Sequence, residues 1–143
     1  MKKIFFPVEK EYGLLFSFEK EGMTFSDYCY EKTFVERYNK IFSKKIEDFC
    51  DLDNNIFDIV IDNDIRENNH KINGYPEFAQ NDPREYAENL RRYDTLLLQI
   101  DSDFYDNEWR ILWGDAGTCN FFINREDLKK RNFEDILYNW DCC

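Results

Sequence analysis

Residues 95–117 read TLLLQIDSDFYDNEWRILWGDAG, and this stretch decides the fold. It opens with an apolar run free of Gly and Pro, which is typical of a buried β-strand over residues 94–101. An acidic turn follows, and WRILW predicts the next strand over residues 109–113. Gly114 and Gly117 then mark a hairpin turn, because glycine adopts positive φ angles at little cost. The stretch therefore predicts two strands of an antiparallel sheet.

The strands continue beyond this turn to the end of the chain. TCNFFIN suits a returning strand over residues 118–124, and ILYNWDC suits a last strand over residues 136–142. Strands joined by hairpins form an antiparallel sheet. The predicted C-terminal meander has strands near residues 94–101, 109–113, 118–124 and 136–142.

Two helices are predicted to pack this sheet. Apolar residues recur at spacings of three and four over residues 32–49, as in an amphipathic helix. Asp82 is a good N-cap and Pro83 suits the first helical position, so a helix should run over residues 83–91. Helices and meander together predict an α+β fold with a mainly antiparallel sheet.

Three further segments carry local signals. Residues 12–19, YGLLFSFE, combine an apolar run with alternation and predict a strand. Residues 125–130 predict a short helix capped by Asn124. Residues 51–69 fit either a short helix or a strand inside a polar loop, and both alternatives stay open.

Length and composition fit one soluble domain over residues 1–143, long enough for its own hydrophobic core. The five cysteines show no CxxC or Cys/His spacing, which favours free thiols over disulfides or a zinc site. No apolar run reaches the roughly 18 residues of a membrane span, and the N-terminus lacks a signal-peptide core. We therefore expect a full-length cytoplasmic protein without a cofactor.

The charge is strongly uneven. Residues 1–50 hold equal numbers of acidic and basic side chains, so the rest of the chain carries the whole net charge of −11. Such a surface repels nucleic acids and anionic membranes and favours a basic partner. Most of the excess lies in two runs, residues 51–70 and 101–115, which form one acidic face only if the fold brings them together. The partner-binding candidates in these runs are Asp51, Asp53, Asp58, Asp62, Asp64, Asp101, Asp103, Asp106, Glu108 and Asp115.

An alternative site centres on His70, the single histidine of the chain. A histidine mechanism needs a nucleophile or carboxylate in contact, which spacing alone does not reveal, so a structural hydrogen bond is the simpler interpretation. Both acidic runs lack the glycine and the final glutamate of a calcium loop, so no metal site is predicted. The residues of this alternative pocket are His70, Tyr75, Gln80, Gln99, Asp101 and Asp115.

The aromatic residues of the predicted strands suit a core and cross-strand pairs, Trp109 among them. Neighbouring residues of a strand point to opposite faces, so Phe121 and Phe122 cannot both face one core. Unless both faces of the sheet are covered, one of these rings or Trp140 marks an exposed contact patch.

Several motifs in the same order resemble the YwqG-like family of bacterial proteins, a domain of unknown function. They are YGLLFSFEKEGMTFSDYCYE, HKINGYP followed by Gln80 and Asp82-Pro83, LLLQIDSD, WGDAGTCNFFINREDL and NFEDILYNWDC. The resemblance covers most of residues 12–142. Members are typically longer, which implies that this chain corresponds to the C-terminal part of the usual domain. Members often lie near contact-dependent or secreted toxin genes, which implies an immunity-like or protein-binding role.

Two functional hypotheses follow. The first is a non-enzymatic acidic protein that binds a basic protein, for example an immunity protein that neutralises a basic toxin such as a nuclease. The second is a small-molecule or metal-binding protein, or a hydrolase-like enzyme, that uses the acidic cluster with His70. The second requires these groups to converge in a concave pocket.

Overall fold

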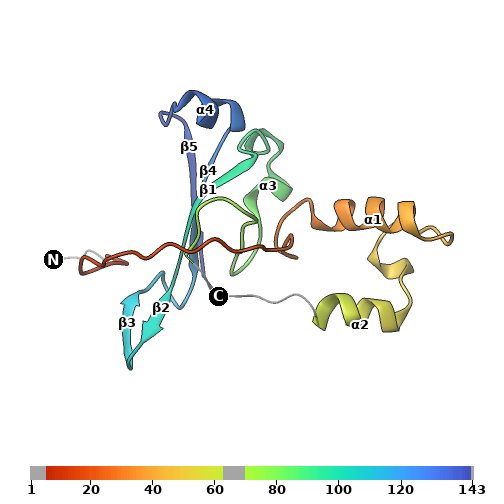
Figure 1. The fold of residues 1–143 in the computed structure, drawn as a ribbon, viewed down its shortest axis with the longest axis horizontal. Helices are drawn as coiled ribbons and strands as arrows, with labels where there is room; N and C mark the ends of the chain where they lie inside the picture. Colours follow the sequence, from red (N-terminus) through yellow and green to blue (C-terminus); the bar gives the residue numbers. More distant parts are fainter. Residues whose placement is uncertain (1–5, 63–69, 143) are drawn as a thin grey trace.

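The computed structural model describes residues 6–62 and 70–142, and it confirms an α+β fold with antiparallel sheets (Figure 1). The main sheet has three strands in the order β1 (Thr95–Asp101), β4 (Thr118–Ile123) and β5 (Ile136–Asp141). A separate two-stranded sheet is formed by β2 (Asp103–Tyr105) and β3 (Glu108–Ile111). Three of the four predicted strands therefore form the sheet expected from the sequence.

The central strand β4 carries the main core. Phe122 lies opposite Leu96 of β1 on one side and Leu137 of β5 on the other. Its ring is fully buried and stacks on Phe78, with 6.0 Å between the ring centroids. Tyr93, just before β1, completes this cluster. Strands β1 and β5 thus hold the same ring from both sides, which explains why β4 is the most buried element.

Strand β3 does not join the meander, and the predicted hairpin between it and β4 is wrong. β3 pairs with β2 instead, around Asp106 and Asn107. These two residues have φ angles of 53° and 63°, the left-handed pair that a two-residue hairpin turn requires. Asp and Asn tolerate this region better than other non-glycine residues, so the segment interpreted as an acidic turn forms its own hairpin.

Glycine is required at two positions after β3, for different structural reasons. Gly114 has a φ of +59°, as expected for a turn glycine. Gly117 lies against the backbone carbonyl of Asp141, where a Cβ atom would clash. The turn that contains these glycines therefore packs closely against the end of β5.

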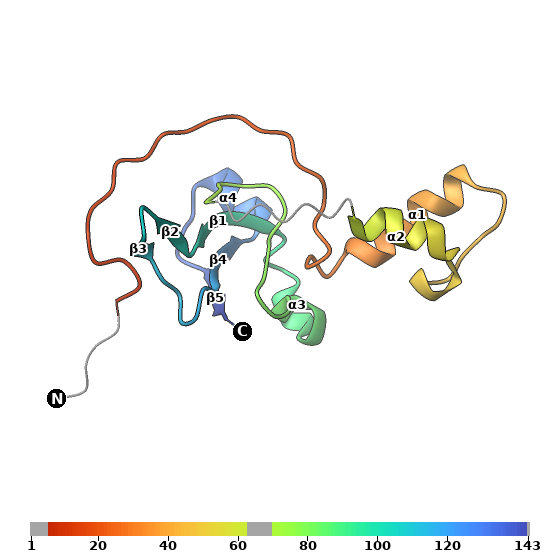
Figure 2. The ribbon, with the colours of Figure 1, turned by 90° about the horizontal axis from the view of Figure 1, so that it is seen from below.

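The helices α1 (Tyr30–Ile41) and α2 (Asn54–Asp62) lie to one side of the sheet (Figures 1 and 2). α1 ends eight residues before the predicted limit, because Phe42 is extended and Asn39 hydrogen-bonds both the backbone N–H and the carbonyl of Ile46. Ile46 is thereby turned back against the helix. A second small core results from Tyr38, Ile46 and Leu52, with Phe34, Val35, Phe49 and Ile56 packed around it.

The 3₁₀ turn Phe49–Asp51 and α2 decide the structure of the open segment as far as residue 62, and its residues 63–69 lie outside the described residues. Residues 54–62 are helical, and Ile56 faces the second core. Asp53 precedes this helix, and its carboxylate accepts the backbone N–H of Asn55. Polar capping and one apolar contact therefore favour the helix over the strand.

The predicted helix over residues 83–91 is split into α3 (Pro83–Tyr86) and a 3₁₀ turn (Glu88–Leu90). Its predicted start is confirmed, since the Asp82 carboxylate accepts the backbone N–H of Arg84 at 2.9 Å. Ala87 between the two pieces is extended, with φ −123° and ψ 95°. The break lets Leu90 pack against the main core.

The last helix, α4 (Arg125–Lys130), has both ends capped. Asn124 accepts the backbone N–H of Glu126 at its start, as predicted. At its end Arg131 adopts the left-handed conformation, with φ 56°. The N–H groups of Arg131 and Asn132 then bind carbonyls of the last turn, as in a Schellman motif.

Residues 12–19 are not a strand, which corrects the sequence-based prediction. The backbone of these residues forms no regular element, and it makes no backbone–backbone hydrogen bond with the described residues. The exposed fractions of Leu15 and Phe18 are 102% and 108%, so these side chains are fully exposed. We call residues 12–19 the strap. A strand needs a partner edge as well as a suitable sequence, and among residues 6–62 and 70–142 the strap has none.

No helix within residues 6–62 and 70–142 has the length and apolar character needed to cross a bilayer.

Candidate functional site

A polar cavity of about 500 Å³ lies beside the edge of the main sheet. Three segments enclose it: residues 23–29, residues 73–76 and the start of β1. Arg125 of α4 also reaches its wall. Among the residues predicted for the alternative pocket, Tyr75 lines this cavity.

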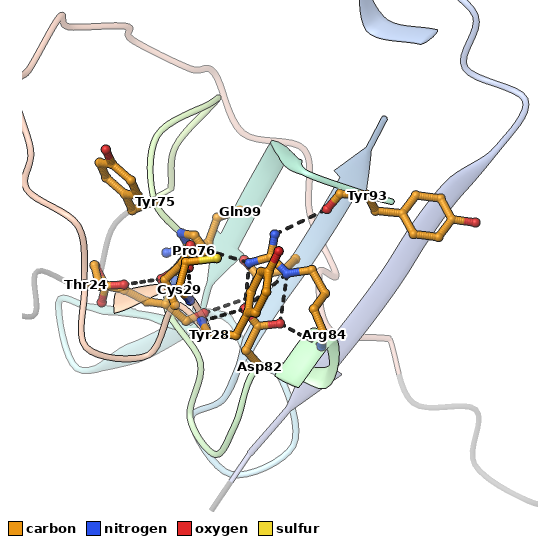
Figure 3. A network of polar contacts seen from close by, with 12 residues as sticks. Thr24, Tyr28, Cys29, Tyr75, Pro76, Asp82, Arg84, Tyr93 and Gln99 are labelled. Carbon is orange, nitrogen blue, oxygen red and sulfur yellow. Dashed lines mark hydrogen bonds and ion pairs between the residues drawn. The ribbon is translucent and has the colours of Figure 1, made fainter. Parts of the chain in front are cut away.

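Arg84 forms the buried end of the cavity, and its ion pair with Asp82 is the most enclosed charge interaction described (Figure 3). The exposed fractions are 3% for the Arg84 side chain and 1% for Asp82. Nε and Nη2 of Arg84 donate to the two carboxylate oxygens at 2.9 Å and 2.6 Å. Nη1 donates to the Tyr93 carbonyl, and Asp27 lies 3.6 Å from Nη2. Burial opposes the charge of Arg84, but the contacts with Asp82 and then Asp27 raise its pKa, so the guanidinium stays charged.

Aromatic rings complete the surroundings of Arg84. Its guanidinium carbon lies 4.8 Å from the centre of the Tyr28 ring and 4.2 Å from that of Phe122, which fits two cation–π contacts. The Tyr28 backbone N–H also donates to Asp82. Burial, and next a hydrogen bond with Cys29, raise the pKa of the Tyr28 hydroxyl to about 12. Tyr28 is therefore neutral at physiological pH.

These contacts make Arg84 a structural link. It joins the segment before α1, the start of α3 and the central strand β4, and its nitrogens are engaged by protein acceptors. Sequence reasoning identified Asp82 as a helix cap and missed Arg84 altogether. The cap was a usable signal, but no local pattern reveals that an arginine two residues later is buried over a sheet.

The single histidine of the chain makes a structural hydrogen bond. Nδ1 of His70 accepts the backbone N–H of Asp101 at 3.1 Å. The next residue, Lys71, forms two backbone hydrogen bonds with Gln99, of 3.1 Å and 2.8 Å. Gln99 in turn accepts the backbone N–H of Glu77 through its side chain. The fold thus brings His70, Gln99 and Asp101 together as a short strand-like contact beside β1.

The remaining residues of the alternative pocket lie elsewhere. Gln80 binds the end of β5, where its side chain donates to the Cys142 carbonyl and its backbone N–H donates to Asp141. Asp115 is exposed in the turn after β3. His70, Gln99 and Asp101 therefore lie together beside β1, whereas the other three residues of this prediction, Tyr75, Gln80 and Asp115, lie at other places around the sheet.

Asp101 is a buried carboxylate at the end of β1. Its Oδ1 accepts the Thr118 hydroxyl and the Ser102 backbone N–H, both at 2.8 Å. Burial raises the pKa of Asp101 above its ordinary value of 3.8, although these hydrogen bonds act in the opposite direction. Burial likewise raises the pKa of Glu77.

The raised pKa of Asp101 predicts a specific pH dependence of stability. The folded protein holds this proton more tightly than the unfolded chain, so stability should fall as pH rises from 3.8 through the folded-state pKa. Asp101→Asn keeps the acceptor oxygen and removes the titration. Urea unfolding between pH 3.5 and 7 should show the variant gaining stability relative to the wild type as pH rises. A stability difference between variant and wild type that stays constant over this pH range would contradict the prediction.

The partner-binding candidates fall into two groups. Asp103, Asp106 and Glu108 lie on the β2–β3 hairpin, whereas Asp51, Asp53 and Asp58 lie on and before α2. Both views place the hairpin and α2 at opposite ends of the molecule (Figures 1 and 2). The described carboxylates on and before α2 therefore do not share one face with those of the hairpin, although His70, at the end of the first run, contacts Asp101 at the start of the second. The side chain of Asp62, and all of Asp64, lie outside the described residues.

Within residues 6–62 and 70–142, no three Asp, Glu, His or Cys side chains gather as a metal centre requires.

The β2–β3 hairpin carries an exposed aromatic cluster beside its carboxylates. The exposed fractions of Phe104, Tyr105 and Trp109 are 54%, 59% and 47%, so Trp109 is not a core residue, although it forms a cross-strand pair with Phe104 as expected. Phe104 and Trp109 meet edge to face at 5.0 Å. Arg110 lies 3.8 Å from the centre of the Tyr105 ring. We call residues 103–110 the acidic aromatic hairpin, which extends away from the main sheet (Figure 1).

The other aromatic expectations hold in part. Phe122 is buried and Phe121 is half-buried, where it meets Tyr138 at 5.1 Å between ring centroids. Trp140 is exposed on β5 and contacts Trp113. The strand alternation therefore correctly placed a partly uncovered aromatic face on the side of the sheet opposite Phe122.

Comparison with known proteins gives a family and no activity. No curated protein matches the chain. The model of a family described as Domain of unknown function (DUF1963) matches residues 2–142. Since this match spans nearly the whole sequence, the protein belongs to the DUF1963 family.

Proposed function

We propose that this protein is a cytoplasmic, non-enzymatic, YwqG-like binding protein that contacts a basic protein partner through the acidic aromatic hairpin. The observation that carries the proposal is the combination of three exposed rings with carboxylates on one projecting hairpin. Aromatic side chains dominate the energetic centres of protein interfaces. Exposed rings on a monomeric surface otherwise have an unfavourable contact with water.

The carboxylates give the hairpin its preference for a basic partner. Asp106 and Glu108 are exposed next to the rings, and Asp103 is half-buried at the base. Negative charge around an aromatic patch accelerates association with a positively charged surface. The tight turn through Asp106 and Asn107 also fixes the hairpin before binding, which reduces the entropy lost on association.

Two polar side chains that a catalytic mechanism could use, those of His70 and Arg84, make contacts within the fold. Nδ1 of His70 is taken by the backbone of Asp101. Arg84 is enclosed by Asp82, Asp27 and the Tyr93 carbonyl. Both side chains make structural contacts within the fold, which supports a binding role over a catalytic one.

An immunity protein that neutralises a basic toxin is the concrete version of this proposal. The test is binding to the purified product of the neighbouring gene, measured by biolayer interferometry at 50 and 500 mM salt. We expect a complex whose association rate falls at high salt, because exposed charges are screened. The absence of a complex would contradict the immunity version.

Hairpin variants test where that partner binds. Trp109→Ala should weaken the complex by roughly 30-fold or more, as loss of an interfacial tryptophan does. The triple variant Asp103→Asn/Asp106→Asn/Glu108→Gln should lower the association rate about tenfold at low salt. The matched controls Phe57→Ala and Asp58→Asn lie on α2, at the other acidic run, and should bind as the wild type does. Equal losses in hairpin and α2 variants would contradict the proposed surface.

A second candidate function is small-molecule binding in the 500 Å³ cavity. Arg125, Asp94 and Tyr75 contribute polar groups to its wall, which suits a small polar ligand. A ligand that raises the melting temperature of the wild type but not of Tyr75→Ala would favour this function. The Trp109→Ala variant should respond to such a ligand as the wild type does.

A further inference from the structure

Two segments of this chain complement each other without touching. One is the strap, residues 12–19, which has a strand-forming sequence and no backbone partner among the described residues. The other is β5 (Ile136–Asp141), which pairs with β4 on one side and forms the edge of the main sheet on the other. An edge strand with open hydrogen-bonding groups is a template for an added strand. We propose that the strap of one molecule adds as a fourth strand to β5 of a second copy.

The side chains of the two segments match in type and alternation. Leu14, Phe16 and Phe18 alternate along the strap and would share one face of an added strand. On β5 the exposed Tyr138 and Trp140 lie on one face in the same way. These rings have exposed fractions of 50% and 44%, so an added strand would cover rings that the sheet leaves in water.

That face of the sheet is apolar beyond β5. Tyr138 lies opposite Phe121, and Trp140 lies opposite Cys119. The Cys119 thiol is fully buried, and burial raises its pKa to about 12. The rings of an added strap would therefore extend an existing apolar surface instead of starting a new one.

The position of the strap indicates a second copy as the donor. Before the strap, Val8 forms a bridge with Ile111 and the Leu112 N–H donates to the Pro7 carbonyl. After it, Glu21 accepts the Tyr75 N–H and pairs with Lys71. Both attachments hold the strap outside β1, whereas β5 is the opposite edge of the sheet (Figure 2). The β5 edge of the same molecule is thus on the far side, while that of a neighbouring molecule is free to receive the strap.

The same exchange in both directions gives a closed two-fold dimer. Each molecule then donates one strap and accepts one, so the two joints are identical. This arrangement covers Phe18, which has the highest exposed fraction among the large apolar side chains of the described residues. It also leaves the acidic aromatic hairpin outside the proposed contact, so the dimer and partner binding are separate properties.

Sedimentation velocity of the full chain from 1 to 200 μM tests the proposal. The wild type should form a dimer. Phe16→Lys/Phe18→Lys in the strap and Tyr138→Lys on β5 should each weaken dimerisation at least ~100-fold, because a charge then replaces buried apolar surface. Phe133→Lys, at an exposed ring on neither segment, should leave the dimer unchanged. Far-UV circular dichroism of each variant confirms that the fold is retained.

Mixing the variants distinguishes strand exchange from other contacts. Each variant alone loses both joints, but a heterodimer of the strap variant with the β5 variant keeps one joint between an intact strap and an intact edge. An equimolar mixture should therefore recover dimers that neither variant forms alone. A monomeric wild type at 200 μM, or no recovery on mixing, would overturn the proposal.

Discussion

Asp82→Ala is expected to lower the free energy of unfolding by about 3–5 kcal/mol, because it leaves the buried Arg84 charge without its main partner. The Asp82 carboxylate also accepts the backbone N–H groups of Arg84 and Tyr28. One substitution thus removes an ion pair, a helix cap and a link to the segment before α1. Urea unfolding followed by tryptophan fluorescence measures the loss.

Two further variants establish the cause. Lys129→Ala breaks the exposed pair with Glu126 and should leave stability within the error of the measurement, since exposed ion pairs contribute little. Asp82→Leu/Arg84→Met removes both buried charges and should recover part of the loss seen in Asp82→Ala. A double variant less stable than the single variant would show that the charge itself is not the source of the effect.

Phe122→Ala should lower the free energy of unfolding by about 3–5 kcal/mol, the usual range for removing a buried phenylalanine. The ring is fully buried at the centre of β4 and contacts Phe78 and the Arg84 guanidinium. Its removal leaves a cavity that β1 and β5 cannot close, because both are hydrogen-bonded to the same strand. The measurement is again urea unfolding at constant pH.

The control for this prediction is Phe133→Ala. The Phe133 ring is exposed between α4 and β5, so its loss should change the unfolding midpoint little. Similar losses at both positions would mean that the cluster around Phe122 is not the main core.

The elements with complete local signals were predicted correctly. β1, β4 and β5 are apolar runs bounded by turn residues, and the structure confirms all three. The caps Asp82 and Asn124 were also identified, because a cap needs only its own side chain and the next two backbone N–H groups. The exposed rings on β2–β3 were not predicted, because the sequence alone does not show that this hairpin forms a sheet of its own.

Pairing between distant segments was not predictable in the same way. The strap has the composition of a strand but lacks a partner edge among the described residues. Strand β3 pairs with β2 and not with β4, because Asp106 and Asn107 adopt left-handed φ angles. Arg84 reads as one charge on a short helix, yet it links residues 27, 82 and 93. Such links depend on where the chain returns, which local spacing does not specify.

The sequence by itself determined the α+β class, the three strands of the main sheet, the helix caps and the excess of acidic residues in the second part of the chain. Only the tertiary structure decided which of those acids are neighbours, which rings remain exposed and which charges are enclosed. The physical reason is that propensity and capping act over a few residues. Burial and electrostatic contact, in contrast, depend on the three-dimensional path, which places α2 and the acidic aromatic hairpin at opposite ends of the molecule.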